Sequence, residues 1–122
     1  MSARPVVYVA GAYTAATAYQ REENIRRAER IALRLHCAGA AVLCVHTMSR
    51  FFWGSAPEAT WIESGLDLLE RCDAVCVVPE WEKSPGSCRE VEHAQEMLIP
   101  IFSVRQCIAL IADGSIVRRF AL

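Results

Sequence analysis

The amino-acid sequence predicts an α/β fold, an open parallel sheet of four to five strands flanked by helices in a three-layer sandwich of the flavodoxin-like or Rossmann-like kind. Two observations predict it. Short apolar segments of strand length alternate along the chain with longer segments of helical periodicity. The strand-like segments are also apolar throughout, which is typical of strands buried on both faces of a parallel sheet.

The first half of the chain contains two expected strands and one long helix. The first strand is expected over Val6 to Ala10, which ends at a glycine. A helix is expected from Gln20 to Ala38, because apolar residues recur every three or four positions and leave an outward face of Arg and Glu. A second strand is expected over 41–45, after a glycine that ends the helix, and a long aromatic loop over 46–57.

The second half repeats the alternation. Helices are expected from Glu58 to Cys72, after Gly86, and over 104–112, with strands over 73–78 and 99–102. The tail over 115–122 fits no single element. The whole chain, 1–122, is therefore expected to form one domain, and its length suffices to bury a core without disulfides or metal.

Composition narrows the function classes. More than half of the residues are apolar, which argues against disorder. The net charge of −1 argues against polymeric nucleic acid or an anionic membrane as partner. The apolar run near the N-terminus is too short for a signal peptide or a membrane span, so we expect a cytoplasmic protein. No cofactor is expected.

The six cysteines do not predict a metal site or a disulfide framework. No CxxC or Cys/His pair has zinc-site spacing, and five of the six lie in apolar stretches where Cys acts as a small hydrophobe. Cys88 differs because it stands at a predicted helix start, where a thiolate is favoured. No histidine can be assigned to it as a base, so catalysis by Cys88 is disfavoured.

The order of elements predicts a small-molecule cleft. In open parallel sheets, ligands bind beyond the carboxyl ends of the strands, near the point where strand order reverses. Gly11 and Tyr13 follow the first strand, His46 follows the second, and the loop 80–86 leads from the third to Glu90. We expect these residues to surround one cleft.

Glu90 is the best candidate for a catalytic group. In the first turn of a helix it would stay ionised and could act as a nucleophile. Helix phase sets it on the flank of an inward stripe (Val91, Ala94, Met97, Leu98), whereas Glu92 and Glu96 point to solvent. The alternative is structural, because Ser87 and Glu90 also have the spacing of a capping box.

Other residues of the cleft have similar alternatives. Ser84, Gly86 and Ser87 could hold a 5′-phosphate or 5′-hydroxyl through hydroxyl and backbone N–H groups, or could simply cap the helix, with Ser84 before a proline. Tyr13 could stack on a base, while Gly11 could allow close approach or only a turn. The aromatic residues 51–53 are expected to seal a lid or a subunit interface, which favours a homo-oligomer.

The chain resembles the nucleoside 2-deoxyribosyltransferase-like superfamily, and within it the small members of the DUF4406 type. The resemblance rests on Val7-Tyr8-Val9-Ala10-Gly11, on Glu23-Asn24-Ile25, on Cys72-Asp73-Ala74-Val75 leading to Pro79-Glu80-Trp81-Glu82, and on Ser84-x-Gly86-x3-Glu90-x3-Ala94. It covers residues 6 to 102. No single motif is specific, but their order and spacing are.

The resemblance implies cleavage of the N-glycosidic bond of deoxyribonucleosides or their 5′-monophosphates, with Glu90 attacking the anomeric carbon to form a covalent glycosyl-enzyme. Water as acceptor gives hydrolysis, and a second base gives transfer. Relatives usually carry an aspartate eight residues before the position of Asp73, and here that residue is Gly65. Glu63 and Asp67 lie on the same predicted helix but are turned away from its buried stripe. This leaves His46 or an acid from a loop to protonate the leaving base.

Three alternatives remain open. The same fold could be a non-catalytic nucleotide sensor, since Gly65 replaces the acid. Pro85-Gly86-x3-Glu90 also has a distant likeness to the loop of nucleotide 5′-monophosphate phosphoribohydrolases, without its second Gly and its Thr. An oligomeric scaffold without ligand is the third.

Overall fold

The computed structural model describes residues 4–120 and confirms the predicted fold class. Four parallel strands form one sheet in the order β2-β1-β3-β4. They are β1 (Val6–Ala10), β2 (Ala41–Leu43), β3 (Ala74–Val77) and β4 (Ile101–Ser103). Strand order reverses between β1 and β3, because β2 lies on one side of β1 while β3 and β4 lie on the other. A fifth strand is absent from the described residues.

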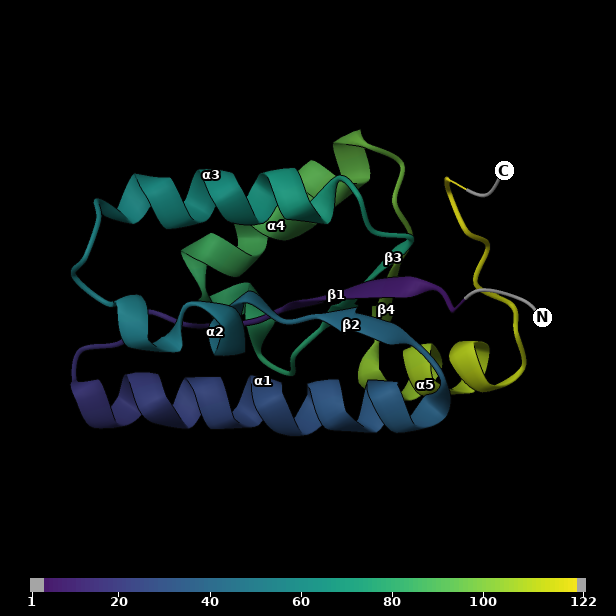
Figure 1. Cartoon of the computed structure of the whole chain (residues 1–122), viewed down its shortest axis with the longest axis horizontal. Coiled ribbons are helices and arrows are strands. Elements are labelled where there is room, and N and C mark those ends of the chain that lie inside the picture. Colours follow the sequence, from purple (N-terminus) through teal and green to yellow (C-terminus); the bar gives the residue numbers. More distant parts are fainter. Residues whose placement is uncertain (1–3, 121–122) are drawn as a thin grey trace.

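Helices cover both faces of the sheet (Figure 1). The helices α1 (Ala18–Ala38) and α5 (Val104–Ala112) pack on one face, and α3 (Glu58–Leu69) and α4 (Pro85–Glu96) pack on the other. Alternate residues of β1 serve the two layers, since Val7 and Val9 join the α1/α5 core while Tyr8 and Ala10 join the α3/α4 core. The central strand is therefore buried on both sides.

Local signals fix the helix ends. Thr17 caps α1 by accepting a hydrogen bond from the backbone N–H of Gln20 at 3.1 Å, and Gly39 ends the helix with a φ of 122°. At α5, Ser103 and Gln106 form a reciprocal capping box. The bounds predicted for α5 are confirmed, and those of α1 are confirmed apart from two further residues at its start.

Other predicted bounds were wrong by a few residues. The second strand ends at Leu43, and two short helices follow it, α2 (Val45–Met48) and η1 (Arg50–Phe52). The first of them begins at the last residue of the predicted strand and continues into the predicted loop. The helix predicted to reach Cys72 ends at Leu69, and β4 begins at Ile101. A further 3-10 helix, η2 (Trp81–Lys83), precedes α4. Residues 115–120 form no helix or strand, and 121–122 lie outside the described residues.

The inward stripe predicted for α4 is correct for Val91 and Ala94 and wrong for Met97 and Leu98. The helix ends at Glu96, and Leu98 adopts a positive φ of 58° that reverses the chain. The N–H of Ile99 then bonds to the carbonyl of Ala94 at 2.8 Å, which closes the helix end. Leu98 is left 88% exposed. Glu92 and Glu96 are exposed, as predicted.

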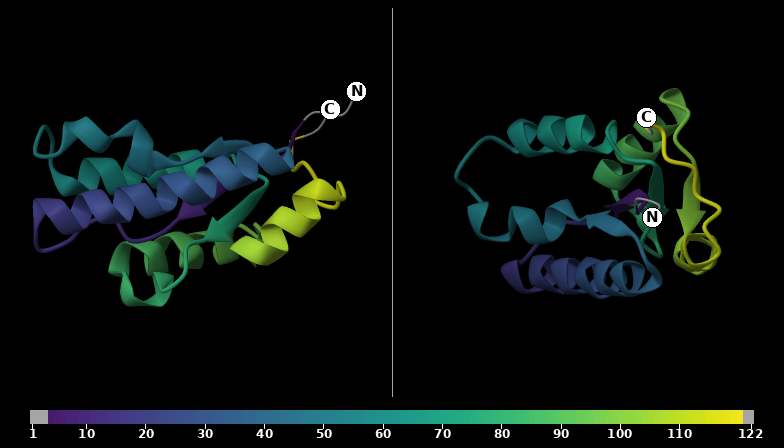
Figure 2. Two further views of the ribbon diagram at one scale, coloured as in Figure 1. Left: turned by 90° about the horizontal axis from the view of Figure 1, so that it is seen from below. Right: turned by 45° about the vertical axis from the view of Figure 1, so that its right-hand side comes forward.

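One buried carboxylate joins the amino ends of the central strands to the C-terminal tail. Asp73 accepts hydrogen bonds from the N–H of Val6 at 2.8 Å and from the N–H of Arg119 at 2.6 Å. The Arg119 guanidinium donates to the carbonyls of Glu70 and Cys72. Both ends of the described chain thus reach the same corner of the molecule (Figure 2).

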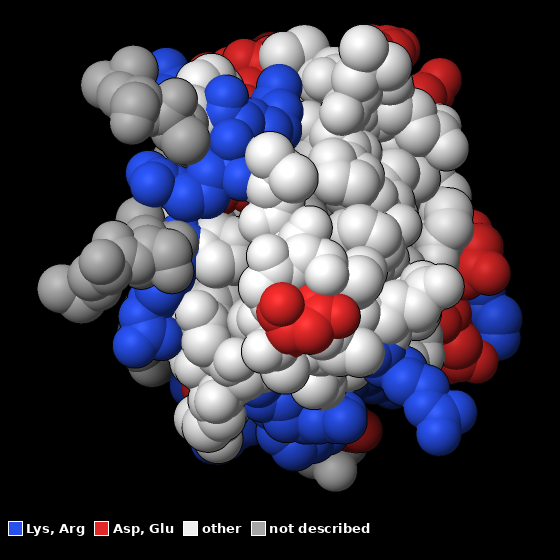
Figure 3. Space-filling view, turned by 90° about the vertical axis from the view of Figure 1, so that its right-hand side faces the viewer, with Lys and Arg blue, Asp and Glu red and all other residues white. Residues whose placement is uncertain are grey.

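The surface at this end of the molecule is largely uncharged, with one acidic group near its centre and both basic and acidic side chains at its edges (Figure 3). Its exposed apolar residues include Leu98, Val117 and Phe120. In the part of the chain that the structure covers, no helix has the length and apolar character needed to cross a membrane. Within residues 4–120, no cluster of His, Cys, Asp and Glu has the geometry of a metal site.

Candidate functional site

The start of α4 is capped by Ser84, and the capping box predicted for Ser87 and Glu90 is wrong. Ser84 is extended, precedes Pro85 at the first helical position, and accepts a hydrogen bond from the N–H of Ser87 at 3.2 Å. Glu90 therefore stands in the second turn, and the expectation that the helix N-terminus keeps it ionised is also wrong. Its carboxyl is free of any capping role.

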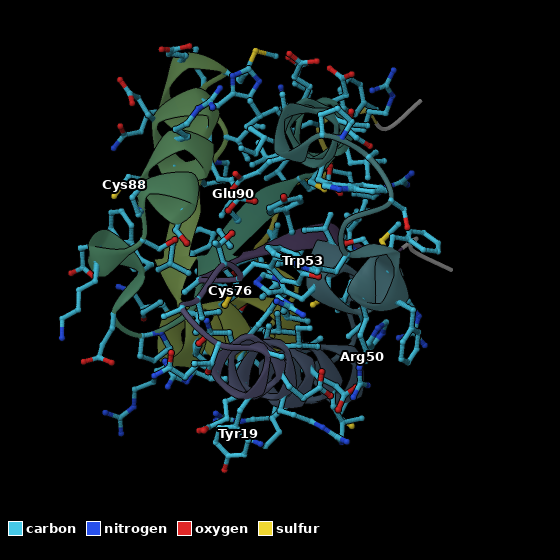
Figure 4. The ribbon with its side chains drawn as sticks, turned by 90° about the vertical axis from the view of Figure 1, so that its left-hand side faces the viewer. Tyr19, Arg50, Trp53, Cys76, Cys88 and Glu90 are labelled. Atoms are coloured by element: carbon cyan, nitrogen blue, oxygen red, sulfur yellow. The ribbon has the colours of Figure 1, made fainter. Side chains whose placement is uncertain are left out.

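Glu90 instead pairs with a tyrosine of the central strand. The hydroxyl of Tyr8 donates a hydrogen bond to Glu90 Oε2. The Tyr8 side chain is fully buried between the sheet and the helices α3 and α4. Glu90 lies between α4 and the sheet at the carboxyl edge, as Figure 4 shows. The pair therefore links the two elements at the point where strand order reverses.

Burial changes the acidity of both groups. Desolvation raises the pKa of Glu90 to about 7, although the Tyr8 hydrogen bond acts in the opposite direction by favouring the carboxylate. Desolvation, followed by the nearby Glu90 charge, raises the pKa of Tyr8 well above its ordinary value. Glu90 can thus exist in either protonation state near neutral pH, which suits a nucleophile or an acid–base group.

Gly65 lies directly beside this pair. It is buried in α3, and a Cβ atom built on it would come within 3.2 Å of the Tyr8 hydroxyl. Glu63 and Asp67, on the same helix, are exposed, in agreement with the predicted helix phase. The position at which the resemblance led us to expect an acid is therefore adjacent to Tyr8, and it carries no side chain.

Ser87 contributes a polar group without a partner. The residue is 1% exposed, and its hydroxyl makes no hydrogen bond to any described residue. It stands one turn before Glu90, so the two side chains lie on neighbouring positions of the same helix face. A buried hydroxyl without a partner is costly, and such groups commonly bind a ligand or water.

His46 holds the loop after β1. It is 2% exposed, and its Nε2 donates to the carbonyls of Gly11 at 3.0 Å and Ala12 at 3.1 Å. Burial lowers its pKa, which favours the neutral ring. The hydrogen bonds of His46 therefore tie it to the backbone of this loop rather than to Glu90.

Gly11 is required by packing. A Cβ atom at this position would lie 2.5 Å from a methyl group of Val78, because the ends of β1 and β3 approach closely. At Gly86 an added Cβ would meet only the Ser84 hydroxyl at 3.9 Å, so internal packing does not require glycine there. The absence of a side chain at Gly86 leaves the first turn of α4 open.

Tyr13 belongs to an aromatic cluster with Trp53 and His46. Its ring centroid lies 6.0 Å from that of Trp53 and 5.7 Å from that of His46. The guanidinium of Arg21 lies 4.0 Å above the Trp53 ring. Sequence reasoning missed Arg21 and Tyr8 as site residues. A tyrosine inside an apolar strand was the available signal, because its hydroxyl needs a partner when buried.

The cysteines take no part in the pair. Four are buried (Cys44, Cys72, Cys76, Cys107), whereas Cys37 is exposed, contrary to its prediction as a core residue. The Cys88 thiol, partly buried, donates to the carbonyl of Glu82 at 3.4 Å. In Figure 4 it lies on the outer side of α4, away from Glu90.

Comparison with curated proteins gives no match. A family model described as "Domain of unknown function (DUF4406)" matches residues 5–103, which include every strand and the helices α1 to α4. The match also includes the Glu90–Tyr8 pair, Gly65 and the capped start of α4. The chain therefore belongs to the DUF4406 family.

Proposed function

We propose that this protein cleaves the N-glycosidic bond of a deoxynucleoside or nucleoside 5′-monophosphate, by hydrolysis or by transfer to a second base. The observation that carries the proposal is the partly buried Glu90 carboxyl, which accepts a hydrogen bond from Tyr8 at the switch point of the sheet and whose pKa desolvation raises to about 7. The sequence resemblance to the nucleoside 2-deoxyribosyltransferase-like superfamily supports it from a separate direction.

The reaction proceeds in two displacements. In the first, an oxygen of ionised Glu90 forms a bond to the anomeric carbon while the bond from that carbon to the base nitrogen breaks, and the base leaves with the bonding pair. In the second, water or another base bonds to the same carbon and loses a proton to solvent, while the bond from that carbon to the Glu90 oxygen breaks and releases the carboxylate. Tyr8 orients the attacking carboxyl, since its hydroxyl donates to one of the two oxygens.

Proton delivery to the leaving base distinguishes this site from its expected relatives. No carboxyl projects from Gly65, and the His46 ring is tied to two backbone carbonyls. The proposal therefore assigns protonation of the base to solvent. A base that leaves readily, or is protonated before cleavage, fits such a site best.

Neighbouring groups supply binding. The unpartnered Ser87 hydroxyl, the open turn at Gly86 and the cap residue Ser84 suit a 5′-hydroxyl or 5′-phosphate. Tyr13 and Trp53 offer aromatic faces for the base. Phe51, two residues before Trp53 in the sequence, is 86% exposed. We therefore also propose that a second copy of the chain covers this segment in a cytoplasmic homo-oligomer, which analytical ultracentrifugation can test.

The experiment is an assay of base release. The protein is incubated with deoxynucleosides, ribonucleosides and their 5′-monophosphates, with and without a second free base, and products are separated by chromatography. The natural chain and the Glu92→Gln variant should release base at similar rates, because Glu92 is exposed on the same helix. The Glu90→Gln variant should lose at least about a thousandfold of the rate. If Glu90→Gln releases base as fast as the natural chain, Glu90 is not the nucleophile.

A second candidate function is nucleotide sensing without turnover, and the missing side chain at Gly65 favours it. It predicts that nucleotides bind the natural chain and the Glu90→Gln variant equally, with no base released over hours. Calorimetry combined with chromatography separates the two candidates, because only the enzyme consumes its ligand.

A further inference from the structure

A second depression lies beyond the carboxyl ends of β3 and β4 and does not include Glu90 or Tyr8. It has a volume of about 620 Å³, within the range of small-molecule sites, although it is open to solvent. Its walls are formed by the end of β3, the start of α5, the C-terminal part of α1 and the segment around η2. It is therefore separate from the contacts that define the Glu90 site.

Two arginines reach this depression without a counter-ion. Arg34 comes from α1 and Arg105 from the first turn of α5, and neither forms an ion pair with any residue in 4–120. The carboxylate of Glu80, which also lines the depression, is paired with Lys83 at 2.9 Å, and the charge of Arg27 also acts on it. Glu82 is the remaining acid. The lining of the depression thus contains two arginines and two carboxylates, and one of these carboxylates, Glu80, is already paired with Lys83.

The walls also provide an aromatic surface. Trp81 is partly buried and lines the depression, with Val78 and Val104 as further apolar contacts. The capping box of Ser103 and Gln106 already uses one of the first N–H groups of α5. Recognition would rest on side chains: an aromatic face and two guanidinium groups.

We propose that this depression, named here the Arg34–Arg105 pocket, binds a small ligand that joins a phosphate to a flat ring, such as a nucleoside monophosphate. The two guanidinium groups hold the phosphate through charge-assisted hydrogen bonds, and the ring lies on Trp81. Lysine would not replace either arginine fully, because the planar guanidinium donates to two oxygens at once. This binding is independent of the proposed reaction at Glu90.

Tryptophan fluorescence tests the proposal. In a chain carrying Trp53→Phe and Trp61→Phe, Trp81 is the remaining indole, so its quenching reports the Arg34–Arg105 pocket alone. The titrant is adenosine 5′-monophosphate, compared with adenosine and with inorganic phosphate. Glu90→Gln is included to prevent turnover. The monophosphate should quench saturably, and each fragment should bind at least about tenfold more weakly.

Matched arginine variants locate the ligand. Arg34→Ala and Arg105→Ala should each raise the dissociation constant by about tenfold or more. Arg30→Ala, one turn away on α1, exposed and outside the depression, should change it by less than about twofold. Circular dichroism and melting of each variant verify folding.

Two results would overturn the proposal. One is no saturable quenching by the monophosphate at millimolar concentration. The other is binding that survives loss of Arg34 and Arg105 but weakens in Ser84→Ala or Ser87→Ala, since the ligand would then lie at α4. Failure here leaves the base-release assay unaffected.

Discussion

The two ends of the sheet differ in how completely their polar groups are paired. At the amino end, both oxygens of Asp73 accept backbone N–H groups, and the Arg119 guanidinium donates to backbone carbonyls of neighbouring segments. At the carboxyl end, the Ser87 hydroxyl has no hydrogen-bond partner among the described residues, and desolvation raises the pKa of Glu90. The polar groups at the amino end are paired with the backbone, whereas those at the carboxyl end remain available for binding and reaction.

This difference follows from the fold. In a parallel sheet the carboxyl ends of all strands meet at one edge, and the loops that follow them can vary without disturbing the core. The price is that groups kept ready for a ligand remain incompletely satisfied in its absence. The predictions below test each side of this contrast.

The largest effect is expected at the paired end. Asp73→Ala removes the acceptor of two backbone N–H groups and should destabilise the protein by about 4 kcal/mol, measured by urea unfolding. Asp113→Ala is the matched control, because Asp113 accepts one N–H, from Ser115, in an exposed turn. A similar loss in both variants would show that burial of the Asp73 contacts matters little.

At the carboxyl end of the sheet, removing the charge of Glu90 should stabilise the folded protein. The folded-state pKa of Glu90, about 7, exceeds the ordinary value of 4.5, so the folded protein binds more protons and loses stability as pH rises between these values. Glu90→Gln should therefore be more stable than the natural chain by up to about 3 kcal/mol near pH 8, with little difference near pH 4. If the stability difference between Glu90→Gln and the natural chain does not grow with pH, the Glu90 carboxylate is not desolvated in the folded protein.

The Tyr8 hydrogen bond should lower the pKa of Glu90. Tyr8→Phe removes the only donor found for this carboxyl among the described residues, so the pKa should rise above about 7 by roughly one unit. NMR titration of the Glu90 side chain measures it directly. If Glu90 is the nucleophile, the rate of base release rises with pH through this pKa, and the midpoint should move with the variant.

The smallest effect is expected at Ser87. Ser87→Ala removes a buried hydroxyl without a partner and should stabilise the free protein by about 1 kcal/mol or less, while weakening nucleotide binding. Calorimetric melting and binding isotherms measure both. Destabilisation would mean that a bound water or a protein group already satisfies the hydroxyl.

Much of the fold was predictable because its signals are local. Continuous apolar runs identified every strand core, and the bounds of α5 follow from its periodicity and its capping residues. The helix phase of α4 correctly separated Glu90 from Glu92 and Glu96. These features depend on a few neighbouring residues, so no knowledge of distant contacts was needed.

The errors arose where distant contacts decide. The apolar run 41–45 fits a strand, but the chain turns into α2 at Val45 and buries His46 against the carbonyls of Gly11 and Ala12. Leu98 continued an apolar periodicity, yet it adopts a positive φ without a glycine to signal it. The partner of Glu90 lies 82 residues away in sequence, and spacing within one helix gives no information about it.

The shared carboxylate of Asp73 also has a consequence for folding order. Its two contacts join segments 67 and 46 residues apart in sequence, so forming them closes long loops of chain. On a ribosome, the contact with Arg119 can form only after almost all of the described chain has emerged. We therefore expect the sheet to assemble before the Asp73–Arg119 contact forms. Because this contact forms late, it should lower the unfolding rate more than it raises the folding rate.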